Sequence, residues 1–270
     1  AVTTGVRQTL IGGLAGDALT TGDNNTAVGY NSLSAMTVGD RNVAVGVGTL
    51  ASANVTSNAD TYNTAVGFDA GNDITTGTSN TLIGGLTGDA ITTASNNTAV
   101  GYASLGTNTT GAGNVAVGRE SLFNNTTASN NTAVGLNSLY TNTTGINNVA
   151  VGKDALIAST TANNNTAVGY DCLQANTTGA SNASVGKSAL EANTTGSANA
   201  AFGADALGSN TTASNNTAVG TNSLNANTTG SENVAVGRNA LDANTTAANN
   251  TAVGYASMGA NTTGAGNTAL

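Results

Sequence analysis

Residues 97–113 read NTAVGYASLGTNTTGAG, and close variants of this stretch follow one another along nearly the whole chain. Its opening Asn, once replaced by Gln8, recurs every 17 residues, and the single exception is the step of 21 residues from Asn42 to Asn63. The sequence is therefore an array of fifteen complete repeats with one four-residue insertion, which we place within residues 51–62. We number the positions of a repeat from 1, the opening Asn, to 17.

The composition excludes several classes of protein. Only 7% of the residues are charged, the net charge is −8, and the sequence has no Pro, Trp or His. Without His there is neither a His-based metal site nor a His-dependent catalytic relay, and the negative charge opposes binding to nucleic acid. No apolar run approaches the roughly 18 residues of a membrane-spanning helix. We therefore expect no enzymatic activity, no cofactor, no bound metal and no insertion into a membrane.

The repeat predicts short β-strands that stack into a parallel β-solenoid. Asn, Thr and Gly are poor helix formers, whereas positions 2–4 alternate as [Thr/Val]-Ala-Val before a Gly that favours a turn. One repeat has too few apolar side chains for a core of its own, so neighbouring repeats must stack. We expect one continuous all-β domain over residues 1–270, a fragment of a longer fibre, with 17-residue turns and a second short strand in the Asn-Thr-Thr-Gly segment.

Alternation along the strand predicts which side chains face the core. Positions 2 and 4 share one face of the strand, and Leu at position 9 supplies a further apolar side chain. The Ala at position 3, as in Ala99 and Ala116, is expected on the outside. We therefore place positions 4 and 9 in the core, as in Val100, Leu105, Val117, Leu122, Val134 and Leu139.

Stacking also aligns the polar side chains of successive turns. The Asn at position 1 forms one candidate column. The Asn at position 12 starts an N-x-T glycosylation pattern, but side chains that point inward cannot be modified. We expect the position-12 residues to form a hydrogen-bonded ladder, which comprises Asn108, Asn125, Asn142, Asn176, Asn193, Asn210, Asn227 and Asn244, with Asn261 as a further member.

The core of such a chain is thin. Burial of a Val or Leu side chain contributes about 1.5–3 kcal/mol, against roughly 1.5 kcal/mol of conformational entropy lost for each ordered residue. Because a repeat has only three or four inward apolar side chains, we expect a homo-oligomer, most simply a trimer, that covers the Ala face.

Two sequence patterns resemble known repeats. The segment NVAVG, at Asn42, Asn114, Asn148 and Asn233, resembles repeats in head domains of trimeric autotransporter adhesins. The longer pattern NTAVGYxSLxxNTTG is similar to repeats in tail-fibre proteins of bacteriophages. The resemblance covers nearly the whole chain and implies a left-handed β-roll wound from three chains, in an extracellular location on a virion appendage or a cell surface. The 17-residue turn is longer than the usual adhesin turn.

Position 6 is often aromatic in one turn and basic in the next. On the outside of the solenoid these residues would form a column in which rings and cations are neighbours, as cation–π contacts require. We consider two roles for it: stabilising the outer edge of the solenoid and binding an acidic cell-surface glycan. The candidate residues are Tyr102, Arg119, Lys153, Tyr170, Lys187, Arg238 and Tyr255.

Three further groups of residues are weaker candidates for a functional site. The Asp and Glu residues are scattered and lack the G-G-x-G-x-D pattern of calcium-binding solenoids, so we interpret them as solvated charges. Cys172, the single cysteine, is expected to be a small buried side chain. The rows of Thr raise the possibility of ice binding, which requires a flat face shared by side chains such as Asn108 and Thr110.

Uniform repetition without a convergent polar site favours a structural role. Our leading interpretation is a segment of a phage tail fibre, or of a similar extracellular appendage, that spaces and supports a receptor-binding tip. The alternatives are a bacterial surface adhesin head that binds host or environmental glycans, and an ice-binding solenoid.

Overall fold

A computed structural model describes residues 3–57 and 59–270, which contain sixteen short β-strands and no helix. The chain divides into two compact units, Ala1–Asn131 and Thr132–Leu270. The first unit contains β1 (Thr9–Ile11), β2 (Thr26–Val28), β3 (Val43–Val45), β4 (Thr64–Val66), β5 (Thr81–Ile83), β6 (Thr98–Val100) and β7 (Val115–Val117). The second contains β8 (Thr132–Val134), β9 (Val149–Val151), β10 (Thr166–Val168), β11 (Ala183–Val185), β12 (Ala200–Phe202), β13 (Thr217–Val219), β14 (Val234–Val236), β15 (Thr251–Val253) and β16 (Thr268–Ala269).

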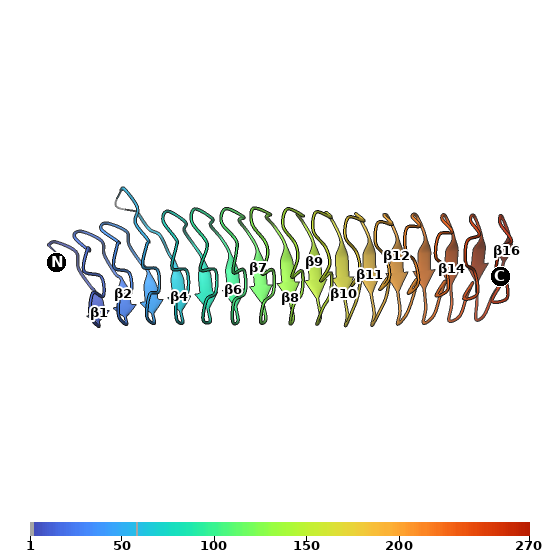
Figure 1. Cartoon of the computed structure of the whole chain (residues 1–270), viewed down its shortest axis with the longest axis horizontal. Helices are drawn as coiled ribbons and strands as arrows, with labels where there is room; N and C mark the ends of the chain where they lie inside the picture. The colour runs from blue at the N-terminus through green and yellow to red at the C-terminus, as the bar shows by residue number, and fades with distance from the viewer. Residues whose placement is uncertain (1–2, 58) are drawn as a thin grey trace. The chain divides into compact units, whose positions relative to one another are not determined.

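Within each unit, every strand pairs in parallel with the next strand along the sequence. The register joins equal repeat positions, for example Ala99 with Ala116 in β6 and β7, and Ala167 with Ser184 in β10 and β11. Figure 1 shows β1–β7 side by side in this order, and β8–β16 likewise. Each unit is thus a parallel β-solenoid with 17-residue turns, and the predicted fold class is confirmed.

Backbone hydrogen bonds between turns continue far beyond the three-residue strands. The amides of Leu105 and Thr109 donate to carbonyls of the following turn, at 2.9 and 2.8 Å. The amides of Gly101 and Ala103 donate to carbonyls of the preceding turn, at 2.8 and 3.0 Å. Each interior turn is therefore bonded to both neighbours. These bonds satisfy the backbone N–H and C=O groups that stacking of the turns buries.

The Asn-Thr-Thr-Gly segment does not form the predicted second strand. Asn108 Nδ2 donates to the carbonyl of Gly111 at 2.9 Å and so closes a local turn. Thr109 Oγ1 donates to the carbonyl of Thr126 in the next turn at 3.0 Å. A side chain that bonds its own backbone three residues on competes with extended structure, which is why the segment stacks as a turn.

The strand face that lies in the core is the opposite of the predicted one. Ala99 and Ala116 at position 3 are fully buried, whereas Val100, Val117 and Val134 at position 4 are only partly buried, on the outer face. The other predicted core residues, Leu105, Leu122 and Leu139 at position 9, are fully buried.

The cross-section of the turn explains this inversion. Position 3 faces positions 9 and 12 across the turn, and a large side chain at one of them requires a small residue beside it. The turn that begins at Asn80 shows the rule, because it has Leu82 at position 3 and Gly88 at position 9. A Cβ atom on Gly88 would lie 2.9 Å from Leu82 Cδ2. Ala is therefore the residue that fits opposite the usual Leu.

Gly at position 5 ends each complete strand because two turns approach closely there. Gly101 has a φ of 136°, and a Cβ atom on it would lie 2.6 Å from the carbonyl oxygen of Gly118. Neither this backbone conformation nor this distance tolerates a side chain. The chain then turns, and position 6 points outward.

Residues at positions 7, 9 and 17 adopt the left-handed backbone conformation. Asp154 at position 7 has a φ of 57°, and Asn130 at position 17 has a φ of 61°. Asp and Asn recur at these two positions because their short polar side chains tolerate this conformation best after Gly. Leu105 at position 9 has a φ of 55°, and the burial of its side chain offsets the backbone strain.

The offset between neighbouring turns rises above 17 residues after Asn54 and reaches 21 at Asn63. Thr37 Oγ1 donates to Asn54 Oδ1 with the usual offset of 17 residues, whereas Asp40 forms a parallel bridge with Asp60, 20 residues later. Arg41 forms an ion pair with Asp60, beside the residues where the offset has changed.

Candidate functional surface

The predicted position-6 column lies on the surface in both units. Its members are all exposed: Tyr102 and Arg119 in the first unit, and Lys153, Tyr170, Lys187, Arg238 and Tyr255 in the second. The turn at the preceding Gly positions them, because it carries the chain out of the strand immediately before position 6.

Only one of the predicted ring–cation neighbours forms a cation–π contact in residues 59–270. The Lys153 ammonium lies 5.0 Å from the centroid of the Tyr170 ring. Its Nζ atom is also 2.9 Å from Asp154 Oδ2. The hydrogen bond to Asp154 is the main cause that raises the pKa of Lys153, so the ammonium remains charged.

The other predicted ring–cation contacts are absent from the described part of the chain. Arg119 turns to the neighbouring carboxylate, with its Nη2 atom 3.1 Å from Glu120 Oε1. Neither Lys187 nor Arg238 lies over a ring. At Arg119 the Glu120 carboxylate competes with the Tyr102 ring, because a charge-assisted hydrogen bond is stronger than an exposed cation–π contact.

The position-12 ladder is buried and hydrogen-bonded within each unit. In the first unit, Asn125 Nδ2 donates to Asn108 Oδ1 at 2.8 Å. In the second, each Asn from Asn193 to Asn261 donates in the same way to the Asn of the preceding turn, at 2.8–3.3 Å. Asn142 is also buried. Ser159 occupies the ladder position between Asn142 and Asn176, and its hydroxyl has no hydrogen-bond partner among the described residues.

A second Asn ladder follows position 1. The amide of Asn114 donates to Asn97 Oδ1 at 2.9 Å, and Asn114 Nδ2 donates to the carbonyl of Ala128 at 2.9 Å. The equivalent bonds link Asn165 to Asn148 and Asn182 to Asn165 in the second unit. Residues of both ladders are buried from Asn97 to Asn250, so the folded chain holds these amides away from solvent and from modification.

The face invoked for ice binding is not present in the form predicted. Asn108 is fully buried, whereas Thr110 is exposed. The two side chains do not share a surface, because the segment that carries them turns instead of extending.

Cys172 at position 8 is buried. Its Sγ atom lies 3.0 Å from Ser184 Oγ, and burial raises the pKa of the thiol to about 11. In the described residues there is no group of three or more His, Cys, Asp or Glu side chains placed to bind a metal ion. Residues 3–57 and 59–270 also include no apolar helix of membrane-spanning length.

The sequence interpretation missed the apolar outer face of the strands. We call the outward side chains at position 4 the valine strip. Its most exposed members include Ile83 in the first unit. In the second unit they are Val185, Phe202, Val219 and Val253. The alternating pattern contained the signal for this strip, but the pattern alone does not say which of its two faces is inside.

No model of a known protein family matches the sequence, and no curated protein matches it.

Proposed function

We propose that this chain is a structural segment of a fibre, in a phage tail fibre or a similar extracellular appendage, where it spaces and supports a receptor-binding tip. The supporting observation is that the interior turns of each unit repeat the same inter-turn contacts: backbone hydrogen bonds in both directions and a buried Asn at position 1. Since each turn adds about 4.8 Å, the number of repeats sets the length of the segment.

Deletion of whole turns tests this role. Removing residues 166–216, which are three repeats, joins Asn165 to Thr217 in the correct register. The shortened chain should fold with a similar melting temperature, and its maximum dimension should fall by about 14 Å in small-angle X-ray scattering. Removing residues 166–190 breaks the register and should destabilise the chain. Equal behaviour of the two deletions would contradict the proposal.

The fibre segment is proposed to be a homo-oligomer, most simply a trimer, that buries the valine strip. A continuous apolar face on the outside of a sheet is typical of an interaction surface, and the second unit exposes Val185, Val219 and Val253 along it. Substituting Val185 and Val219 by Lys should shift the native mass to that of one chain. Thr178→Lys, at an exposed position outside the strip, should leave the mass unchanged.

The alternative function, an adhesin head that binds glycans, rests on the position-6 column. Lys153 over the Tyr170 ring presents a cation beside an aromatic face, an arrangement that suits an acidic sugar. The double substitution Lys153→Gln and Tyr170→Ser separates the two functions. Under the spacer proposal, attachment of the intact appendage to cells is unchanged; under the adhesin alternative, attachment falls severalfold.

A further inference from the structure

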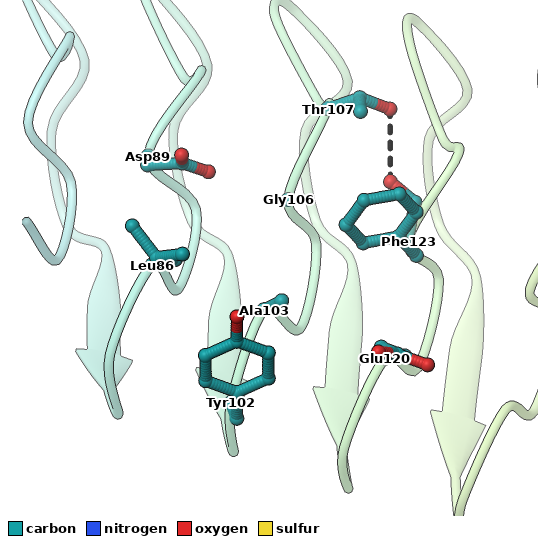
Figure 2. Close-up of a pocket in the computed structure, with 8 residues that line it drawn as sticks. All are labelled: Leu86, Asp89, Tyr102, Ala103, Gly106, Thr107, Glu120 and Phe123. Carbon is teal, nitrogen blue, oxygen red and sulfur yellow. Dashed lines mark hydrogen bonds between the residues drawn. The ribbon is translucent and has the colours of Figure 1, made fainter.

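A small cavity of about 290 Å³ opens on the first unit. It spans three consecutive turns, with Ala103 and Gly106 of the middle turn between the side chains of the two flanking turns (Figure 2). Leu86 and Asp89 lie on one side of them, and Glu120 and Phe123 lie on the other (Figure 2). The cavity is close to the lower end of the roughly 300–1,000 Å³ of ligand pockets, so any occupant is small.

The cavity exists because the middle turn has small residues where the two flanking turns have larger ones. Gly106 is at position 10, which is Asp89 in the preceding turn and Phe123 in the following turn. A Cβ atom on Gly106 would lie 2.8 Å from Phe123 Cε2, so the Phe123 ring leans over this glycine. The hollow is therefore a property of three adjacent turns and not of the repeat.

Two rings and two carboxylates alternate around the hollow. Figure 2 shows Tyr102 diagonally opposite Phe123, and Asp89 diagonally opposite Glu120. Glu120 is already bonded to Arg119. Asp89 has no Lys or Arg within ion-pair distance among the described residues.

The surroundings of Asp89 disfavour its charged form. The carboxyl group is partly buried, and this burial is the largest cause that raises its pKa; Asp73 and Asp69 add like-charge repulsion. A positive charge placed beside Asp89 would favour the charged carboxylate and so offset both effects. Aromatic faces next to a carboxylate attract organic cations in particular, because the rings contact the methyl or methylene groups that carry the charge.

We propose that this cavity binds a small organic cation, an alkylammonium group whose charge lies beside Asp89 and whose apolar surface contacts Tyr102 and Phe123. Anionic ligands are opposed by the two carboxylates. Neutral ligands of the same shape gain only the apolar contacts.

Titration of the full chain with choline, followed by amide chemical shifts in NMR, tests this proposal. Choline should produce saturable shifts at residues around Gly106. Its uncharged isostere 3,3-dimethylbutan-1-ol should bind about tenfold more weakly or less. Equal binding of the two compounds, or no saturation of the choline shifts at tens of millimolar, would overturn the proposal.

Asp89→Asn should weaken choline binding about tenfold or more. The fold should be retained, because the substitution removes a charge that burial disfavours. Asp242→Asn changes the same repeat position in the second unit and should leave binding intact. Unchanged binding in Asp89→Asn contradicts the assignment, whatever the control shows.

Phosphocholine separates two sources of the ammonium group. If choline binds and phosphocholine does not, the result supports a ligand whose ammonium group has no phosphate beside it. Binding of choline and phosphocholine with similar affinity supports the headgroup of a lipid. Binding of phosphocholine alone contradicts the proposal, since the phosphate would then be the recognised group.

Discussion

At the scale of single residues, the Asn at position 12 stabilises the stack by bonding to the preceding Asn and to its own turn. Asn193 shows both bonds, to Asn176 Oδ1 and to the carbonyl of Gly196, each at 2.9 Å. Two consecutive Asn at this position thus link their turns side chain to side chain, whereas the first five turns have Leu19, Met36, Ala53, Ile74 and Ile91 there instead.

Ser159 interrupts this ladder, and Ser159→Asn should therefore stabilise the chain. The new amide would reach Asn142 and the carbonyl of Ala162 as its equivalents do elsewhere, and we expect a gain of about 1 kcal/mol in the free energy of unfolding. Urea denaturation measures it. Ser159→Ala is the control and should be nearly neutral, because the hydroxyl has no partner. Equal stability of the two variants would show that the slot does not accept Asn.

Two adjacent glycines differ sharply in what they tolerate. Gly84 at position 5 has a φ of 139° and faces the carbonyl of Gly101, so Gly84→Ala should cost about 3 kcal/mol. A Cβ atom on Gly85 would meet nothing nearer than 3.9 Å, so Gly85→Ala should change stability by less than about 0.5 kcal/mol. Thermal unfolding of both variants compares them; a milder effect at Gly84 would contradict the close approach.

At the scale of one turn, packing depends on positions 3, 9 and 12 together, because Gly at position 9 occurs with Leu or Ile at position 12. Leu82→Ala should cost about 3 kcal/mol, because Leu82 fills the space beside both Gly71 and Gly88. Gly88→Leu alone should also destabilise, by overpacking. Combined, the two substitutions move the large side chain from position 3 to position 9. Part of the loss should be recovered, because Ile91 at position 12 still crowds position 9. A double-mutant cycle in denaturant measures the coupling, and additive effects would disprove it.

The same choice explains which part of a turn could be predicted from the sequence. The period, the strand positions and the Leu at position 9 follow from the pattern of residues. The inner face of the strand does not, because a hydrophobicity argument places Val100 inside and Ala99 outside, whereas the narrow cross-section requires the reverse. The signal that was overlooked is the joint change at Leu82, Gly88 and Ile91, which shows that positions 3, 9 and 12 share one space.

The candidate site was less predictable than the fold. The exposure of the position-6 column followed from its place after Gly. The contacts of its side chains could not be predicted. Arg119 bonds to Glu120 of its own turn, and the repeat pattern is equally compatible with a contact between Arg119 and Tyr102. The cavity beside Gly106 depends on departures from the repeat in three successive turns, which a consensus averages away.

At the scale of a whole unit, stability is approximately the sum of similar turns and their interfaces. Cys172 reports on the opening of the second unit, because burial raises the pKa of its thiol to about 11 and little thiolate is present at pH 8. We expect negligible modification by iodoacetamide at pH 8 in the native state and complete modification in denaturant, measured by mass spectrometry. Thr178→Cys, at an exposed position, should react at once. Rapid labelling of native Cys172 would contradict its burial.

The bonding of every interior turn to both of its neighbours has a mechanical consequence. A force that peels the end turn of a unit breaks only the bonds to one neighbour, and the next turn remains closed. Each turn released in this way adds roughly 58 Å of extended chain in place of about 4.8 Å of stack. Under tension a unit therefore lengthens in discrete steps of similar size, and each step absorbs work before the force acts on the fully extended backbone.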